Sequence, residues 1–462
     1  MKFIADLHIH SKYSRATSKD MTLEELDRWA DDKGILVMAT GDFTHPEWLK
    51  EIKEKLEPAE PGLFKLKPQY KKQTIKGTSA ETRFFLSTEV SSIYSRGGRV
   101  YRIHNLIFAP DIETVEKINT QLSWIGNLKS DGRPILGLDC RELVKIVVGT
   151  NEKCAVVPSH IWTPWFSLFG SMSGFDSIEE CFGEYSKYIF AGESGLSSDP
   201  GMNWRLSQLD NIAIISNSDS HSFQRIGREA NIFDTELSYD GIIEAIKNGI
   251  PATRINIDKN TDKNGLISTN PCSHQRKSVF LATIEFFPEE GKYHFDGHRL
   301  CGVVFSPEET KKHNGICPKC GRRLTIGVMN RVEKLADRST IESETKGFYQ
   351  SYDNRVPFYN LIPLDEIIAE AYGLGVAAKK VKEEYENLIK IFGSELKILL
   401  EVNDEEMKGP PAGGVDNKIR QGIKAVREKR LKIRPGFDGE YGKISIFSKE
   451  EKENLETQKT LF

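Results

Sequence analysis

The sequence lacks any run of about 18 uninterrupted apolar residues, the length that a membrane-spanning helix needs. Its start, Met-Lys-Phe-Ile-Ala-Asp-Leu-His, is strand-like and then polar, unlike a secretory signal. Cysteine is also scarce, with seven in 462 residues and a single Cys-x-x-Cys pair, which argues against a disulfide framework. We therefore expect a cytoplasmic protein with reduced thiols and no membrane association.

The chain also lacks a large excess of charge, because 64 Lys and Arg residues oppose 67 Asp and Glu residues. This balance excludes no class of partner, since a basic face can be offset by acidic surface elsewhere. Hydrophobic residues make up 38% of the chain, as in ordinary globular proteins. A chain of 462 residues is too long for one ordinary core, so we expect two or three domains.

The first half alternates short apolar runs with amphipathic stretches. We expect strands at residues 2–9, 35–40, 83–89, 102–108, 155–160 and 212–216, and helices at 23–32 and 112–125. This alternation predicts an α/β fold of repeated βα units, around a parallel sheet or barrel, over residues 1–255. Residues 58–82 lack the pattern and are predicted to be a surface insertion.

Three further regions are expected beyond residue 255. Residues 256–330 contain a small Cys/His segment and are predicted to be a zinc-binding domain. Residues 331–448 are predicted to be a mainly helical and basic region, with helical spacing over 364–400. Residues 449–462 are predicted to be a flexible tail.

Histidines and carboxylates recur where the predicted strands of the first half end. His8 and His10 lie two residues apart on a strand, so their side chains project from the same face. Because chemistry gathers at the carboxyl ends of strands in α/β folds, we expect these residues to converge. The candidate metal ligands are His8, His10, Asp42, His45, Glu89, His104, His160, Asp219 and His221.

Imidazole and carboxylate ligands without thiolate suit zinc, manganese or iron, and magnesium is a further candidate where carboxylates dominate. A shared carboxylate such as Glu89 can bridge two ions, which then activate water and stabilise charge on a phosphate ester. The alternative is a set of core histidines paired with local carboxylates.

These motifs, in this order, resemble those of the polymerase-and-histidinol-phosphatase (PHP) superfamily. The resemblance covers roughly residues 1–255 and implies a distorted seven-stranded barrel that usually holds three metal ions. It implies three ligand groups: His8, His10, Glu89 and Asp219; then Glu89, His104 and His160; and finally His45 with His221. Where many members carry an aspartate after the second histidine, this chain reads Ser14-Arg-Ala-Thr-Ser18. Asp42 or Asp20 would substitute there, or the third ion would be weakly held.

Two more carboxylates follow in a predicted loop at the same end of the fold. Glu193 is a candidate ligand or orienting group, and Asp199 is a candidate for the same role. Each could instead be an ordinary loop acid. With Glu89 and Asp219 they form the predicted catalytic set.

A second metal site is predicted from cysteine spacing. His298-Arg-Leu-Cys301 is followed, after fifteen residues, by Cys317-Pro-Lys-Cys320-Gly, which is the paired-ligand spacing of a zinc ribbon. Cys272, His294 or His313 could replace His298, and the Cys-x-x-Cys pair could alternatively be a redox pair. Cys140, Cys154 and Cys181 are expected to be core thiols.

Basic and aromatic residues suggest contact with nucleic acid. Residues 418–434 contain eight Lys or Arg residues against one Glu, more than an ordinary solvated face carries. The candidate phosphate contacts are Lys418, Arg420, Lys424, Arg427, Lys429 and Arg430. Trp162, Trp165, Trp204 and Arg205 are candidates for holding bases, although core packing would also explain each ring.

Over most of residues 1–445 the sequence resembles the endonuclease Q family of DNA-repair enzymes. The resemblance is carried by the barrel motifs, by the loop that starts at Glu193, by both halves of the Cys/His segment and by Asp353-Asn-Arg-Val-Pro-Phe-Tyr-Asn-Leu-Ile. It implies cleavage by metal-activated water on the 5′ side of hypoxanthine, uracil, xanthine or an abasic site, which leaves a 3′ hydroxyl and a 5′ phosphate. The expected partner is damaged DNA in the nucleoid.

Two other functions stay open at this point. A PHP phosphatase acting on a small phosphomonoester would need only the first 255 residues, and a DNA- or clamp-binding module would need no catalysis. The last residues, including Gln458, Leu461 and Phe462, resemble the start of a sliding-clamp binding peptide, although an inert tail would have similar composition.

Overall fold

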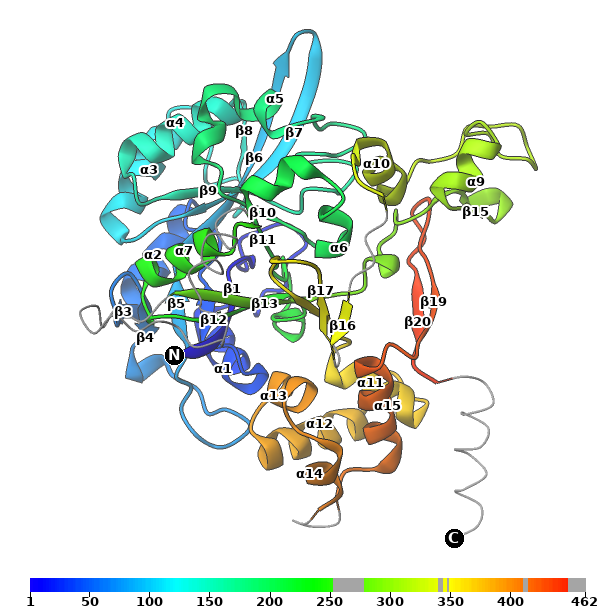
Figure 1. The fold of residues 1–462 in the computed structure, drawn as a ribbon. Coiled ribbons are helices and arrows are strands. Elements are labelled where there is room, and N and C mark those ends of the chain that lie inside the picture. The colour runs from blue at the N-terminus through cyan, green and yellow to red at the C-terminus, as the bar shows by residue number, and fades with distance from the viewer. Residues whose placement is uncertain (252–277, 340–343, 347–348, 410–413, 448–462) are drawn as a thin grey trace, which may run out of the picture.

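The computed structural model describes residues 1–251, 278–339, 344–346, 349–409 and 414–447. Its elements form a mixed α/β fold with several sheets (Figure 1). Among the described residues, no helix is long and apolar enough to cross a membrane. The tail at 449–462, with the predicted clamp motif, and Cys272 lie outside the described residues.

The first half contains most of the strands. Its strands are β1 (Lys2–Asp6), β2 (Val37–Ala39), β3 (Leu56–Pro58), β4 (Phe64–Leu66), β5 (Arg83–Phe85), β6 (Ser87–Arg96), β7 (Arg99–Phe108), β8 (Ile135–Leu136), β9 (Ala155–Pro158), β10 (Ala191–Glu193), β11 (Ala213–Ile215) and β12 (Ala230–Asp234). Its helices are α1 (Leu23–Lys33), α2 (Pro46–Lys55), α3 (Ile112–Ser123), α4 (Cys140–Thr150), α5 (Ile178–Phe182), α6 (Pro200–Asn203) and α7 (Tyr239–Asn248). Each of the six strands expected from the sequence overlaps an observed strand.

These strands are divided among three sheets. A ten-stranded sheet has the order β16-β17-β18-β13-β12-β1-β2-β5-β4-β3, a four-stranded sheet has the order β8-β6-β7-β9, and β10 pairs with β11. β1, β2 and β5 are parallel neighbours, but β6 pairs antiparallel with β7, and β7 pairs antiparallel with β9. The expectation of a uniformly parallel arrangement is therefore wrong, and closure into a seven-stranded barrel stays a prediction.

Residues 58–82 are more than a surface insertion. β4 pairs with β3 on one side and with β5 on the other, which joins this segment to the ten-stranded sheet. Leu63 and Leu66 are buried there. The sequence pattern failed because strands of three residues are too short to show a clear alternation.

The second half adds strands to the same sheet and a group of helices. The strands are β13 (Val279–Glu285), β14 (Asp296–His298), β15 (Val303–Phe305), β16 (Glu344–Lys346), β17 (Tyr349–Ser351), β18 (Phe358–Asn360), β19 (Lys432–Arg434) and β20 (Lys443–Ser445). The helices are α9 (Pro307–Lys312), α10 (Val328–Leu335), α11 (Leu364–Tyr372), α12 (Lys379–Phe392), α13 (Glu395–Leu400), α14 (Asp404–Lys408) and α15 (Asn417–Arg427). The ten-stranded sheet thus takes strands from both sides of the boundaries expected near residues 255 and 330, and the division into domains stays a prediction.

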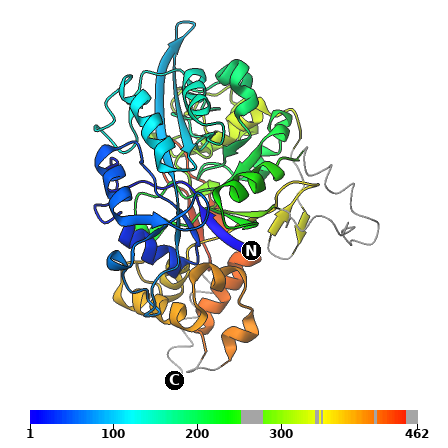
Figure 2. The same ribbon diagram turned by 90° about the vertical axis from the view of Figure 1, so that its left-hand side faces the viewer.

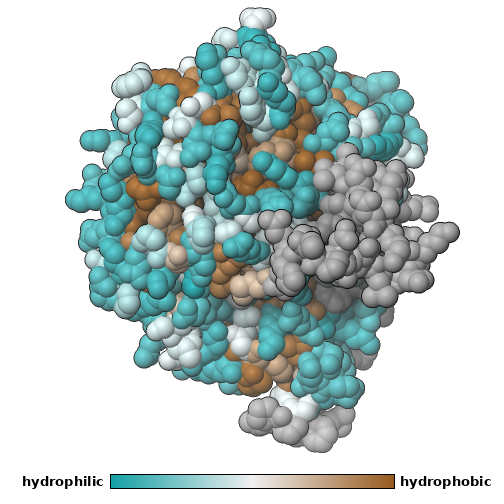
Figure 3. All heavy atoms as spheres, turned by 60° about the vertical axis from the view of Figure 1, so that its left-hand side comes forward, coloured by the Kyte–Doolittle hydropathy of each residue, from teal (hydrophilic) through white to brown (hydrophobic). Residues whose placement is uncertain are grey.

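The helical region confirms the expectation for residues 364–400, because α11, α12 and α13 fill it. Figures 1 and 2 both show α11–α15 gathered at one end of the molecule, beneath the first half. The face seen in Figure 3 is mostly hydrophilic, with hydrophobic side chains in several separate patches.

The two halves of the chain pack closely against each other at Gly34. This residue ends α1 with a φ of 90°, and its backbone N–H donates to the carbonyls of Ala30 and Asp31. A Cβ on Gly34 would lie 2.5 Å from Ser394 Oγ, in the cap of α13. Beside it, Lys33 Nζ lies 2.8 Å from Glu395 Oε2, and both side chains are buried.

We predict that Gly34→Ala lowers the free energy of unfolding by about 2–3 kcal/mol, because it adds a steric clash to the cost of a left-handed conformation. Gly373→Ala is the matched control, since Gly373 has a φ of 67° and nothing within 4 Å of its added Cβ. It should cost about 1 kcal/mol. Equal losses in chemical denaturation would show that the α1–α13 contact adds nothing.

Candidate metal centre

The predicted ligands follow or end strands of the first half. His8 and His10 come directly after β1, Asp42 and His45 follow β2, and Asp219 and His221 follow β11. Glu89 and His104 lie within the β6–β7 hairpin, and His160 follows β9. An isolated parallel bridge between Ile9 and Ser220 holds the segments after β1 and β11 together.

The first cluster contains His8, His10, Glu89 and Asp219, whose ligand atoms all lie within 4.8 Å of one another. His10 Nε2 is 3.1 Å from Asp219 Oδ1 and 3.4 Å from Glu89 Oε2. The buried Nε2 atoms of both histidines and Asp219 Oδ1 have no hydrogen-bond partner among the described residues. Buried polar atoms are costly to leave unpaired, so these converging atoms fit a divalent cation.

The second cluster uses the other oxygen of Glu89. Glu89 Oε1 lies 3.1 Å from both His104 Nδ1 and His160 Nε2, and the two ring nitrogens are 3.2 Å apart. One buried carboxylate is therefore shared by two groups of histidines. This arrangement suits two ions bridged by Glu89.

Two buried carboxylates contact the other ring nitrogens of the first cluster. Glu193 Oε1 is 3.0 Å from His8 Nδ1, and its Oε2 accepts a hydrogen bond from His160 N. Asp42 Oδ1 is 3.0 Å from His10 Nδ1, and its Oδ2 accepts from the backbone and side chain of Ser11. Contacts of this kind fix the tautomer and orientation of a metal-binding histidine. Glu193 and Asp42 thus lie on the side of His8 and His10 that faces away from the cluster.

The electrostatics of the first cluster are strongly negative. Burial alone lowers the pKa of His8, but the charges of Glu193, Asp219 and Glu89 raise it well above its ordinary value. Burial likewise opposes ionisation of His10, yet the nearby carboxylates of Asp42, Asp219 and Glu89 raise its pKa to about 10. A site that favours a proton on each imidazole so strongly would also attract a divalent cation.

Three of these residues adopt left-handed backbone conformations although they are not glycine. The φ angles are 46° for Asp42, 30° for His160 and 46° for Asp219. Such conformations cost about 1–3 kcal/mol each and persist where the surroundings impose them, often at functional sites. Gly132 packs against this region so closely that a Cβ would lie 2.3 Å from Asp42 Oδ2.

The proposed third ligand pair is not brought into either cluster. The His45 ring stacks on Tyr13 with 4.3 Å between centroids, and burial lowers its pKa. The His221 ring lies 4.5 Å from that of His10, and its Nδ1 bonds the backbone oxygen of Asp219. A third ion stays a prediction. Asp199 belongs to neither cluster either, because its side chain caps α6 by accepting from Met202 N at 2.8 Å.

Arg133 is a site residue that the sequence did not reveal. Its Nη1 donates to Glu89 Oε2 at 3.0 Å, and the charge of Glu89 overcomes burial to raise the pKa of the guanidinium. It lies in an irregular loop without a recognisable motif, so only the fold brings it to Glu89.

The cysteine segment assembles as the spacing predicts. Ligand atoms of His298, Cys301, Cys317 and Cys320 lie within 4.8 Å of one another, with Cys320 Sγ 3.4 Å from His298 Nδ1. Burial raises the pKa of the Cys317 thiol, but backbone N–H groups of Lys319 and Cys320 outweigh it and lower the value to about 7. His294 and His313 are not in this group.

Several predicted DNA contacts are wrong because their side chains are used inside the protein. Trp162 is fully buried and donates from Nε1 to Asn203 Oδ1 at 2.7 Å. Trp204 is buried against Tyr352 and Phe358, and the buried Arg205 pairs with Glu333 at 2.6 Å. Trp165 is half-buried, and its role in binding stays a prediction.

The basic segment likewise makes contacts within the protein. Arg427 donates to the carbonyls of Ile398 and Leu399, Lys429 donates to Asn360 Oδ1, and Arg420 pairs with Asp404. These contacts hold α15 and the residues after it against neighbouring segments. Lys424 and Arg430 are exposed, and Lys418 is half-buried.

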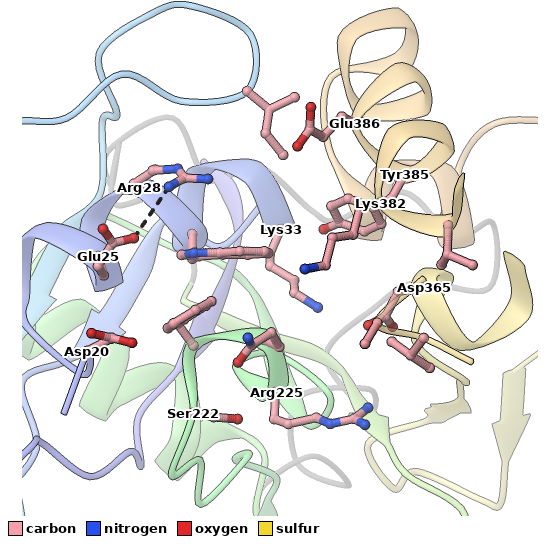
Figure 4. A pocket seen from close by; sticks show the side chains of 17 residues that line it. Asp20, Glu25, Arg28, Lys33, Ser222, Arg225, Asp365, Lys382, Tyr385 and Glu386 are labelled. Atoms are coloured by element: carbon pink, nitrogen blue, oxygen red, sulfur yellow. Dashed lines mark hydrogen bonds and ion pairs between the residues drawn. The ribbon is translucent and has the colours of Figure 1, made fainter. Parts of the chain in front are cut away.

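A separate cavity of about 660 Å³ lies between α1, the turn η4 (Phe223–Arg225) and α12 (Figure 4). Asp20, one of the substitutes considered for the missing aspartate, lines this cavity. Both arginines that line the cavity are paired with carboxylates, Arg28 with Glu25 at 3.5 Å and Arg225 with Glu366. The cavity therefore belongs to the junction between the two halves of the chain.

We predict that Cys317→Ser lowers the thermal midpoint and releases about one zinc per chain, since a closed thiolate site contributes to folding. Cys154→Ser is the control, because Cys154 is a buried thiol outside the cluster. It should reduce stability without loss of zinc. Unchanged zinc in Cys317→Ser, measured by atomic emission, would refute the assignment.

Comparisons with known proteins give consistent matches. A family model described as the MJ0043 C-terminal domain matches residues 363–430. The uncharacterized protein MJ0043 of Methanocaldococcus jannaschii is 33% identical over 65% of this chain, which spans only 32% of that protein. The uncharacterized protein YqxK of Bacillus subtilis is 27% identical over 96% of this chain and 99% of its own length.

Two solved structures match the whole fold. The lesion-specific endonuclease PfuEndoQ of Pyrococcus furiosus has a TM-score of 0.77 and 28% identity over 99% of both chains. Endonuclease Q in complex with a 27-mer duplex substrate, with an abasic lesion at the active site, has a TM-score of 0.76 and 28% identity over 98% of both chains. The similarity to endonuclease Q extends along the full length of the fold, and it supports an endonuclease Q assignment for this chain.

Proposed function

We propose that this protein is a metal-dependent endonuclease that cleaves DNA next to a damaged nucleotide. The observation that carries the proposal is Glu89, whose two carboxylate oxygens serve two histidine clusters. The full-length likeness to a lesion-specific endonuclease supports DNA as the substrate.

The residues fit a pair of divalent ions, of zinc, manganese, iron or magnesium. His8, His10, Glu89 and Asp219 would hold one, and Glu89, His104 and His160 the other. Ions in these places supply activated water and offset charge on the attacking and leaving oxygens of the phosphodiester. The ligand sets offer imidazole and carboxylate only, which suits this chemistry.

The remaining groups position the ligands and the substrate. Glu193 and Asp42 would hold His8 and His10 in the tautomers that present Nε2 to the cluster. Arg133 lies at hydrogen-bond distance from Glu89, and its guanidinium would also donate to a phosphate oxygen of the substrate. These side chains are fixed before substrate arrives, so little reorganisation is needed in the transition state.

The lesion is proposed to be hypoxanthine, uracil, xanthine or an abasic site, with cleavage on its 5′ side to leave a 3′ hydroxyl and a 5′ phosphate. A mispaired or missing base is extruded from the duplex at lower cost than a paired one, which provides part of the selectivity. The solved relative with an abasic lesion at its active site supports this class of substrate. We further propose structural zinc at residues 298–320 and DNA contact by exposed side chains of residues 331–448.

A phosphatase acting on small phosphomonoesters is the competing function. It would use the same clusters, but it would leave the second half of the chain unexplained. The likeness to endonuclease structures extends through this second half, which favours the DNA substrate.

We predict that Glu89→Gln and Asp219→Asn each lower the cleavage rate of a uracil-containing duplex at least about a thousandfold, because several kcal/mol of charge stabilisation is lost. Glu81→Gln, at an exposed carboxylate, should retain full activity. Products are resolved on a denaturing gel against uracil, hypoxanthine, abasic and undamaged duplexes. Hydrolysis of a phosphomonoester with all four duplexes intact would contradict the proposal.

A further inference from the structure

A groove of about 710 Å³ lies between α2 and α3. Lys50 and Lys53 of α2 line one wall, Asn119 of α3 lines the other, and Lys129 lines the end. We call this the lysine groove. No component of the cleavage site described above lines it.

The lysine groove is continuous with the metal centre. Thr44, which lines the groove, donates from its hydroxyl to Gly132 O at 3.2 Å, and Gly132 packs on Asp42. The imidazole of His45 interacts by a hydrogen bond with the backbone carbonyl of Lys129. The loop that contains Lys129 and Gly132 continues to Arg133, which donates to Glu89.

The groove is positively charged. Its lysines are exposed, and the carboxylate that lines it is Glu116, which pairs with Lys53 Nζ at 2.5 Å. Among the described residues, the ammonium groups of Lys50 and Lys129 have no ion pair that neutralises them. Three lysines against one carboxylate favour an anionic occupant such as a sugar-phosphate backbone.

An exposed tryptophan stands at the rim. Trp124 follows α3 and lies between Ser123 and Ile125, and Ser123 and Gly126 both line the groove. Its side chain is 78% exposed, whereas Trp48, Trp162 and Trp204 are buried, and Ile125 and Ile135 are also exposed. An indole that does not serve the core offers a flat face on which a nucleobase can stack.

Trp124 at the rim is close in sequence to Arg133 at the metal centre. Eight residues lie between Trp124 and Arg133, so the two Cα atoms, nine steps of the chain apart, are separated by at most about 32 Å. Single-strand grooves bind roughly 4–16 nucleotides, and a strand of that length can extend over a distance of this order. A strand that leaves the clusters through the lysine groove would pass the three lysines before it reaches Trp124.

We propose that the lysine groove binds the DNA strand that flanks the cleaved phosphate, with phosphates on Lys50, Lys53 and Lys129 and one unpaired base stacked on Trp124. This inference rests on the proposed endonuclease function and identifies a second contact with the same substrate. The base must be unpaired because both faces of a paired base are covered by its neighbours in the duplex.

The test measures the contribution of the Trp124 ring to binding separately from that of the lysine charges. For a single-stranded, undamaged oligonucleotide, Trp124→Ala should weaken binding by about tenfold, as expected for one lost stacking contact. Trp124→Phe keeps a ring and should recover most of the affinity. The triple variant Lys50→Ala, Lys53→Ala, Lys129→Ala should lower the slope of log affinity against log salt by about 2, since each single-strand phosphate contact contributes roughly 0.7.

Lys117→Ala is the matched control, because Lys117 is exposed on α3 but pairs with Glu113 and does not line the groove. Binding is measured by fluorescence anisotropy with the full-length protein, and thermal midpoints should match the wild type because the changed side chains are exposed. Affinity and salt slope equal to wild type in both Trp124→Ala and the triple variant would overturn the groove proposal. If the wild-type protein does not cleave lesion-containing DNA, the proposed endonuclease function is overturned. The binding measurement would still test the groove in that case.

Discussion

Glu89 is the side chain on which the arrangement of the site depends. A buried carboxylate is costly unless it is compensated, and here the compensation comes from four imidazoles and the guanidinium of Arg133. Burial raises the pKa of Glu89, but His104, Arg133 and His8 outweigh burial and hold the pKa well below its usual range. Because its oxygens serve different clusters, a shift of this one group would disturb both.

The surrounding fold acts to keep that group and its partners in place. The β6–β7 hairpin carries Glu89 and His104 on paired strands, while His8, His10, His160 and Asp219 arrive on loops from separate sheets. Left-handed backbone at three of the site residues turns these loops inward, and Gly132 makes room for Asp42. Packing of the strands beneath, where Val90, Leu106 and Ile107 are buried, offsets the free-energy cost of this backbone strain.

Much of this site could be predicted from the sequence, because His8, His10, His160 and Asp219 each follow a short apolar run that forms a strand. The grouping of His8, His10, Glu89 and Asp219 is the one that the family resemblance implies, and the grouping of His298 with three cysteines is the one that the spacing predicts. Arg133 could not be predicted, since no local pattern marks a loop arginine that reaches a carboxylate 44 residues away in sequence. Trp162 and Trp204 were misassigned because the sequence does not record that Asn203, Tyr352 and Phe358 enclose them.

The central claim is that Glu89 bridges two metal ions. The most direct measurement is anomalous scattering from crystals of the protein loaded with manganese. The account predicts two peaks beside Glu89, one bounded by His8, His10 and Asp219 and the other by His104 and His160. A single peak that leaves one histidine group without an ion, or no peak beside Glu89, would contradict it.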